Sequence, residues 1–181
     1  RANRSTRGAW TLFKHHRGNV TALLTTTLPA KIAWMAVLGA GNLNDLDLAV
    51  LSRSTERLEL HGLDLDGDAM RHGLARQLAV RDAPSVACHL EEGDLTGMLD
   101  SLEDHGGVGL EVLPDEAFEE LLERAHSHRV LLGPAGGAGV FDTVLSAAVL
   151  SQFCRHLNLL LRTPEQFTAL CASVAEAHLF S

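Results

Sequence analysis

Cysteine and basic charge are both scarce in this sequence, and each shortage excludes a class of protein. The three cysteines, Cys88, Cys154 and Cys171, are odd in number and far apart. We therefore expect neither a disulfide framework nor a CxxC metal or redox motif. The 23 acidic residues outnumber the 15 lysines and arginines, which gives a net charge of -8. Such a surface would repel the phosphates of a nucleic acid, so no nucleic-acid partner is expected.

Long apolar runs are also missing. No run approaches the roughly 20 residues needed to cross a bilayer, and the first residues lack the pattern of a signal peptide. We therefore expect a soluble, cytoplasmic protein without a membrane partner. The basic residues gather in one place near the start: Arg1, Arg4, Arg7, Lys14 and Arg17. We interpret this cluster as a solvated helix face, with a binding patch as the alternative.

Apolar residues make up 46% of the 181 residues, which is enough for one domain with a sizeable core. We predict a helical segment over residues 1–30. A Rossmann-like cofactor-binding domain is predicted over residues 31–181, incomplete at its C-terminal end. Because the chain begins without methionine and stops directly after an apolar helical pattern, we expect it to be a fragment.

Strand and helix patterns alternate along most of the chain. Amphipathic helices, interrupted around Gly18, are predicted within residues 9–28. Short apolar runs predict strands over 32–38, 58–63, 86–90 and 141–145. Helices are predicted over 44–52, 69–78, 116–126, a stretch ending near 161 and a stretch starting at 164, with a short helical stretch ending at 102. Parallel strands need such crossovers, so the predicted class is α/β, a Rossmann-like three-layer sandwich with a mostly parallel sheet and N-terminal helices.

A glycine turn, Gly39–Gly41, follows the first predicted strand directly. In parallel sheets ligands bind beyond the carboxyl ends of the strands. Glycine lets the backbone turn tightly and come close to a ligand. The turn is therefore the first candidate for a binding site.

Acidic residues recur at the ends of successive predicted strands. Asp45 and Asp47 follow the first strand, Asp64 the second and Asp94 the third. Asp64 lies 25 residues beyond Gly39, close to the interval of about 20 residues at which an acid meets ribose hydroxyls in nucleoside-binding folds. These acids could instead cap helices, and we interpret Asp66 and Asp68 in that way.

Charge separates two classes of cofactor. A dinucleotide places its pyrophosphate on the N-terminus of the first helix, where this sequence has Asp45 and Asp47. A like-charge contact at about 4 Å costs roughly 1 to 4 kcal/mol. S-adenosylmethionine has no phosphate and carries a sulfonium and an ammonium group. The two carboxylates favour it.

Four segments resemble the class I S-adenosylmethionine-dependent methyltransferases: VLGAGN (37–42), GLDLD (62–66), EEGDLTG (91–97) and FDTVLSAAVLSQ (141–152). The resemblance covers about residues 32–179. It implies that Gly39 and Gly41 line the methionine moiety, that Asp64 holds the ribose and that Asp94 and Leu95 frame the adenine, with Ser146 and Ala147 beside the cofactor. The complete predicted cofactor-binding set is Gly39, Ala40, Gly41, Asn42, Asp45, Asp64, Leu65, Asp94, Leu95, Ser146 and Ala147.

Two features depart from that family. The chain stops before the last strands of the family's fold, and SAAVLSQ does not match the Asn-Pro-Pro-aromatic motif of enzymes that methylate bases or glutamine. We expect an unidentified, small-molecule acceptor. No catalytic residue is assigned: His15 and His16 could act as a base or be solvated helix residues. No metal site is predicted, because His126 and His128 have no third ligand at a suitable spacing.

Two other functions remain open at this point. One is an NAD(P)-dependent oxidoreductase on a related sheet. The other is a non-catalytic cofactor-binding or interaction module. Oligomeric state is not predicted.

Overall fold

The computed structural model describes residues 2–79, 86–98, 114–128, 141–146 and 163–179. The chain forms two compact units. The first comprises residues 1–93 and 132–147, and the second comprises residues 94–131 and 148–181. The predicted division into residues 1–30 and 31–181 stays a prediction.

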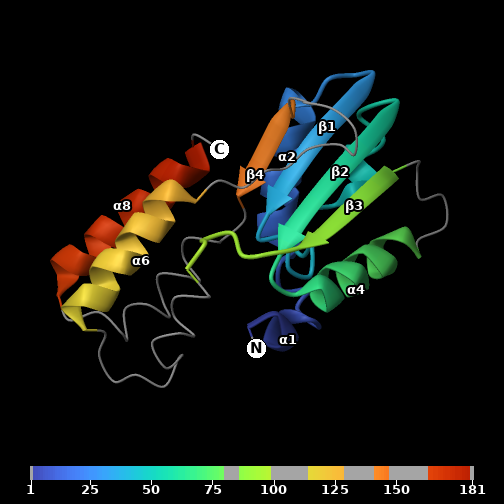
Figure 1. The fold of residues 1–181 in the computed structure, drawn as a ribbon. Helices are drawn as coiled ribbons and strands as arrows, with labels where there is room; N and C mark the ends of the chain where they lie inside the picture. Colours follow the sequence, from blue (N-terminus) through green and yellow to red (C-terminus); the bar gives the residue numbers. More distant parts are fainter. Residues whose placement is uncertain (1, 80–85, 99–113, 129–140, 147–162, 180–181) are drawn as a thin grey trace. The chain divides into compact units, whose positions relative to one another are not determined.

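Four parallel strands form the sheet of the first unit (Figure 1). They are β1 (Ile32–Leu38), β2 (Arg57–Asp64), β3 (Val86–Glu92) and β4 (Thr143–Ser146), in the order β3-β2-β1-β4. The predicted first strand has the observed bounds, and the other three differ from prediction by one or two residues. The predicted α/β class with a parallel sheet is confirmed.

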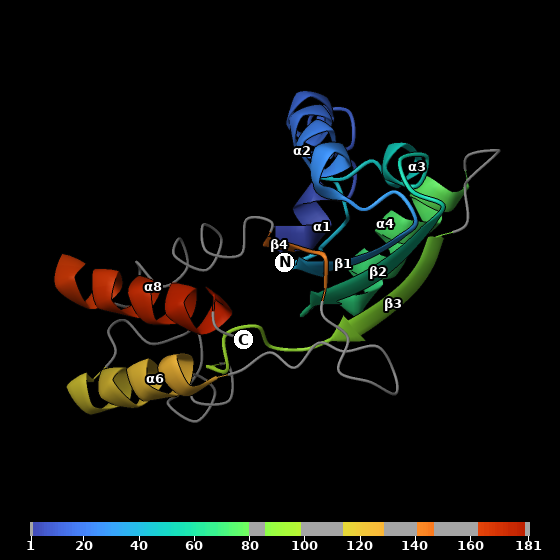
Figure 2. The ribbon, with the colours of Figure 1, turned by 90° about the horizontal axis from the view of Figure 1, so that it is seen from above.

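Helices α2 (Lys14–Thr27), α3 (Leu48–Leu51) and α4 (Gly67–Leu78) lie over one face of this sheet (Figure 2). Their apolar side chains meet alternate residues of the strands, because successive residues of a strand point to opposite faces. The shared core contains Leu24, Leu28, Ala33, Met35, Val37, Leu48, Leu51, Leu58, Leu60 and Met70. A short helix, α1 (Ala2–Thr6), precedes α2.

The other sheet face carries a group of aromatic and ionisable side chains. The rings of His61 and His89 stack with their centroids 4.6 Å apart, and Trp34 stacks on His61 at 6.1 Å. Glu59 is 4% exposed and pairs with Arg57 at 2.5 Å. His61 is 5% exposed, and its Nε2 atom has no hydrogen-bond partner among the described residues. Burial, and secondly the charge of His89, lower the pKa of His61, with Glu59 and Glu91 opposing.

This pKa shift predicts a pH-dependent stability. Because the folded pKa of His61 lies below 6.5, the unfolded chain takes up a proton first as pH falls below that value, and stability present above pH 6.5 is lost. We expect His61→Phe to lose less free energy of unfolding than the wild type between pH of about 7.5 and about 5.5. Urea unfolding at both pH values measures this, with exposed His72→Gln as the control. Parallel losses in wild type and His61→Phe would contradict the prediction.

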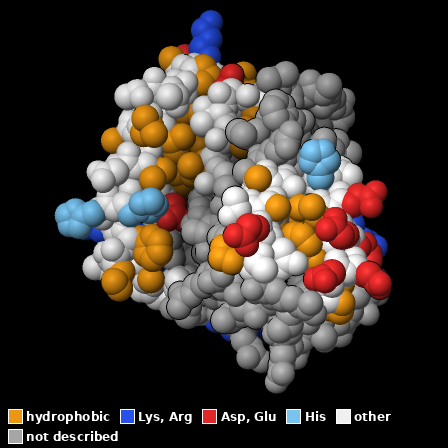
Figure 3. Space-filling view, turned by 90° about the vertical axis from the view of Figure 1, so that its left-hand side faces the viewer, with side chains coloured by type: hydrophobic (Ala, Val, Ile, Leu, Met, Phe, Trp, Pro, Cys, Tyr) orange, Lys and Arg blue, Asp and Glu red, His pale blue; other side chains and the backbone are white. Residues whose placement is uncertain are grey.

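The second unit contains helices α6 (Asp115–Ser127) and α8 (Pro164–Leu179), which pack against each other. The predicted start of the last helix is confirmed, because the backbone N–H of Gln166 donates to the hydroxyl of Thr163 at 3.2 Å. Acidic side chains gather on one face of this unit (Figure 3). An open hollow there is lined by Glu119, Glu120, Leu122, Glu123, His126 and Ser173.

Two helix predictions are wrong in part. Helix α2 continues through Gly18, where we predicted an interruption, because the buried Arg17, Thr21 and Leu24 hold its inner face in place on both sides. The predicted helix over 44–52 is reduced to the four residues of α3. Its first residues instead form turns that bond to other segments.

Other helix predictions have mixed outcomes. The helix predicted over 69–78 is confirmed as α4, with Asp66 as its N-cap. The short helix predicted to end at 102 is absent from residues 94–98, where the Asp94 carboxylate accepts the Thr96 N–H in a turn. The helix predicted to end near 161 lies outside the described residues. Within the part of the chain that the structure describes, no helix is long and apolar enough to cross a membrane.

Candidate functional site

The glycine turn bends back onto the end of β2. The backbone N–H groups of Gly39 and Ala40 both donate to the carbonyl of Leu63, at 2.8 and 3.2 Å. Gly39 has φ 68° and Gly41 has φ 46°, in the left-handed region that glycine adopts without steric cost. Leu43 follows with φ 51°, although it is not glycine. The turn thus places the backbone of residues 39–41 directly beside the carboxyl end of β2.

Asp64, the last residue of β2, lies against this turn. Its Oδ2 atom accepts the Gly41 N–H at 2.9 Å, and its Oδ1 atom accepts the Asp66 N–H at 2.9 Å. A third hydrogen bond comes from the side chain of Asn3, whose Nδ2 donates to Oδ1 at 3.1 Å. Asp64 is 9% exposed. The sequence-predicted pair of glycine turn and acid is therefore brought together.

The strand order places this pair beside a switch point, where the chain stops adding strands on one side of β1 and adds the next strand on the other side. From β1 the chain proceeds through β2 to β3 on one side, whereas β4 pairs with β1 on the other side. Ligands of open parallel sheets bind at such switch points, outside the carboxyl ends of the strands. Ser146 at the end of β4 is aligned with Leu38, the residue before Gly39. The predicted position of Ser146 beside a cofactor stays a prediction.

The remaining predicted site residues lie in different surroundings. Leu65 follows Asp64 and is 51% exposed. Asp94 and Leu95 belong to the second unit, where the Asp94 carboxylate also accepts the Thr96 hydroxyl at 2.7 Å and Leu95 is buried. Ala147 lies outside the described residues.

Helix α1 covers the glycine turn and makes polar contacts with it. The Asn42 amide donates to the backbone carbonyl of Asn3 at 2.6 Å and to the Thr6 hydroxyl at 3.1 Å. The Asn44 amide donates to the carbonyl of Thr6 at 2.9 Å. The residues just after the turn thus hold the first helix in place through its backbone.

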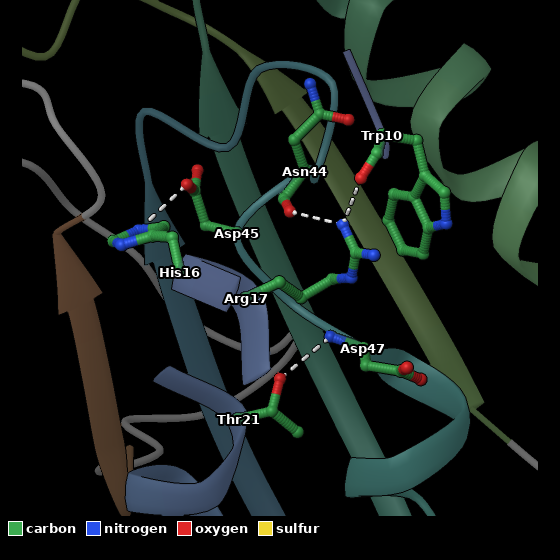
Figure 4. A network of polar contacts seen from close by, with 7 residues as sticks. All are labelled: Trp10, His16, Arg17, Thr21, Asn44, Asp45 and Asp47. Carbon is green, nitrogen blue, oxygen red and sulfur yellow. Dashed lines mark hydrogen bonds and ion pairs between the residues drawn. The ribbon is translucent and has the colours of Figure 1, made fainter. Parts of the chain in front are cut away.

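Two arginines, Arg17 and Arg76, contact the segment after α1, and Figure 4 shows the contacts of Arg17 with Trp10 and Asn44. Arg17 is 7% exposed and donates to the carbonyls of Trp10 at 2.8 Å and Asn44 at 3.2 Å. The guanidinium groups of Arg17 and Arg76 lie 3.4 and 4.3 Å from the centroid of the Trp10 ring, a distance at which cation–π attraction is significant. Arg76 also donates to the Asn42 carbonyl at 2.8 Å. Burial lowers the pKa of both arginines.

The charge argument drawn from the sequence needs correction. Asp45 pairs with Nε2 of His16 at 3.1 Å, and burial raises the pKa of its carboxyl group, with His16 opposing. Asp47 caps α3 by accepting the Val50 N–H at 3.1 Å. Both acids are also attracted by Arg17. The loop therefore lacks the excess of unpaired negative charge that the sequence suggested.

A different feature now disfavours a pyrophosphate. Helix α3 begins seven residues after Gly41 and is only four residues long. Protein side chains already bind the N–H groups at its start: Thr21 accepts from Asp47 at 3.1 Å, and Gln77 accepts from Leu48 at 2.8 Å. A diphosphate needs such N–H groups free at a helix N-terminus that directly follows the turn.

Sequence reasoning missed four residues that shape the site: Asn3, Gly73, Arg76 and Gln77. A Cβ atom on Gly73 would overlap the backbone carbonyl of Asn42, so this glycine lets α4 approach the loop. Its position inside a helix was a usable signal, because such glycines often have a packing reason. Nothing in the local sequence marks Asn3, Arg76 or Gln77.

The described residues give little support for a metal site, a cysteine nucleophile or a histidine base. In the described segments, no group of three or more His, Cys, Asp or Glu side chains could hold a metal ion. Burial, and secondly the charge of Glu59, raise the pKa of the Cys88 thiol to about 11, so it is not an activated nucleophile near neutral pH. His15 and His16 are both exposed.

No protein-family model matches the chain, and no similar protein was found among curated proteins or solved structures.

Proposed function

We propose that this chain binds S-adenosylmethionine and is a methyltransferase acting on a small-molecule acceptor. The observation that carries the proposal is the carboxylate of Asp64, held 2.9 Å from the Gly41 N–H beside the switch point of a parallel sheet. An acid in that position is suited to the two hydroxyls of a ribose. The closed start of α3 favours a nucleoside without a diphosphate. We also propose a cytoplasmic location.

The residues present fit such a cofactor. An ionised carboxylate accepts about four hydrogen bonds, two on each oxygen. The protein backbone uses one position on each oxygen of Asp64, through Gly41 and Asp66. When the Asn3 amide does not bind Oδ1, each oxygen of Asp64 can accept one more hydrogen bond, and a ribose diol can donate these two bonds. Gly39 and Gly41 have no side chains that would keep a ligand from the backbone.

The protein's role in this reaction is chiefly orientation. S-adenosylmethionine supplies, when bound, a methyl group already activated by a positively charged sulfur. Asp64 would hold the ribose, and Gly39 and Gly41 would line the methionine moiety. Ser146, at the end of the neighbouring strand, would lie beside the cofactor. Holding two reactants in line in this way lowers a barrier by several kcal/mol. We assign no catalytic base.

Titration of Asp64→Asn with S-adenosylhomocysteine tests the proposal. The amide removes the negative charge and one acceptor, so we expect affinity to fall about tenfold to hundredfold. Isothermal titration calorimetry gives this value, with NAD⁺ and NADH titrated in parallel. The matched control is Asp68→Asn, because the Asp68 side chain is 82% exposed and pairs with Arg71.

Thermal unfolding establishes that both variants are folded. Equal affinity of Asp64→Asn and wild type would remove Asp64 from the site. Binding of a nicotinamide dinucleotide in place of S-adenosylhomocysteine would overturn the methyltransferase assignment.

A further inference from the structure

The side chain of Asn3 occupies the position on Asp64 that a ribose needs. With Asn3 in place, Oδ1 of Asp64 accepts two hydrogen bonds, from Asp66 and Asn3, and Oδ2 accepts one, from Gly41. Because each oxygen accepts about two, only Oδ2 retains a position. A ribose diol donates two hydrogen bonds and needs one position on each oxygen. Asn3 and a ribose therefore compete for Oδ1.

Asn3 also fills the space beside the glycine turn. Its Oδ1 atom lies 3.0 Å from where a Cβ atom of Gly41 would be, and Oδ2 of Asp64 lies 3.8 Å from the same point. The side of Gly41 on which a side chain would project is thus covered by α1. A ligand reaching the Gly41 backbone from this side would meet the Asn3 amide first.

The contact of α1 with the site is made by polar groups, and some buried polar atoms near it have no hydrogen-bond partner among the described residues. Of the α1 side chains that the structure describes, those of Asn3, Arg4 and Thr6, none belongs to the apolar core cluster. Two buried atoms near the contact, Oδ1 of Asn42 and Nε of Arg76, have no hydrogen-bond partner in the described residues. Unsatisfied buried polar atoms destabilise the arrangement that buries them. The closed position of α1 therefore depends on its hydrogen bonds to Asp64, Asn42 and Asn44.

Trp10, four residues after the end of α1, is held against the rest of the first unit. Trp10 lies under the guanidinium groups of Arg17 and Arg76, and its carbonyl accepts from Arg17. Gly8 lies between α1 and this attachment, and a side chain there would meet no atom within 4 Å. A movement of residues 2–7 that leaves Trp10 in place would break two hydrogen bonds near Gly8, from the Ala9 N–H to the Thr6 carbonyl at 3.0 Å and from Arg76 to the Arg7 carbonyl at 3.4 Å.

We propose that α1 is a removable cover of the nucleoside site: Asn3 holds Asp64 in the ligand-free protein, and a bound S-adenosyl nucleoside displaces it. This inference rests on the proposed function, because it assigns the displaced hydrogen bond to a ribose hydroxyl. The cover makes the apparent affinity depend on the fraction of molecules in which α1 is open.

The test is calorimetric titration of wild type, Asn3→Ala and Arg4→Ala with S-adenosylhomocysteine. Asn3→Ala removes the competing amide, so we expect it to bind about 3- to 10-fold more tightly than wild type. Arg4 is exposed on the same short helix, and Arg4→Ala should change affinity less than about twofold.

Hydrogen exchange gives a second readout. Residues 2–7 of Asn3→Ala should exchange faster than those of wild type without any ligand. Saturating S-adenosylhomocysteine should speed exchange of residues 2–7 in the wild type and slow exchange of residues 39–42. Such a pair of opposite changes is not expected if α1 only stabilises the fold.

The outcomes separate this inference from the proposed function. Binding to wild type and Asn3→Ala with equal affinity would overturn the cover and leave the proposed function standing. Weaker binding by Asn3→Ala would also overturn it, since Asn3 would then contact the ligand. Binding to neither protein would remove the proposed function, and the cover with it.

Discussion

The Gly73→Ala variant should be less stable than wild type by about 2 to 4 kcal/mol, because there is no room for a methyl group at this position. A Cβ atom would overlap the backbone carbonyl of Asn42, which has no flexible side chain to yield. Alanine favours a helix over glycine by about 1 kcal/mol, and the figure is net of that gain. Thermal unfolding followed by circular dichroism should show a midpoint lowered by about 5 to 15 °C.

Gly18→Ala is the matched control. Gly18 lies inside α2, and a Cβ atom there would meet nothing within 4 Å. This variant should gain about 0.5 to 1 kcal/mol from helix propensity. The same substitution inside two helices thus has opposite expected signs. Equal stability of Gly73→Ala and wild type would show that α4 is not held against the loop as described.

A second large loss of stability is expected for Gln77→Leu. Gln77 is 6% exposed, and its amide bridges the loop by donating to the Leu43 carbonyl at 2.9 Å and accepting the Leu48 N–H at 2.8 Å. Leucine has a similar size but leaves both backbone groups buried without partners. Each costs about 1 to 3 kcal/mol, so we expect a net loss of about 2 to 4 kcal/mol after the gain from the apolar side chain.

Guanidinium unfolding followed by tryptophan fluorescence measures this loss. Ala75→Leu is the control, because Ala75 is exposed on the same helix and surface substitutions usually stay within about 0.5 kcal/mol. If Gln77→Leu matched the control, the conformation of residues 43–48 would not depend on the amide bridge.

Much of the fold could be predicted from local pattern. Strand β1 is a continuous apolar run, and the start of α8 has a proline and a capping threonine, so both begin where the sequence indicates. The prediction of a helix over 44–52 was wrong at its start, because the predicted first residue, Asn44, forms tertiary contacts. Asn44 bonds to Thr6 and Arg17 instead of opening a helix. Such long-range bonds override the capping preference of an asparagine and are not visible in a window of sequence.

The residues of the candidate site likewise divide into those that local sequence signals predicted and those that they did not. Gly39, Gly41 and Asp64 were predictable because strand ends and left-handed turns leave local signals, and parallel pairing brings adjacent strand ends together. Asn3 was not predictable, since it lies 61 residues from Asp64 and belongs to a short helix without an apolar face. The charges of Asp45 and Asp47 were predictable, but their partners on α2 were not.

Leu43 has a further consequence for ligand recognition. A leucine with φ 51° is strained by about 1 to 2 kcal/mol, and its side chain is only 2% exposed. The hydrophobic core thus keeps the loop in its bent shape even when nothing is bound. If the proposed function holds, a nucleoside would meet a loop that is already in its bent shape, so little backbone entropy would be lost on binding. Under that proposal, differences in affinity among related nucleosides should reflect their own contacts with residues 39–43, because any cost of displacing α1 is common to all of them.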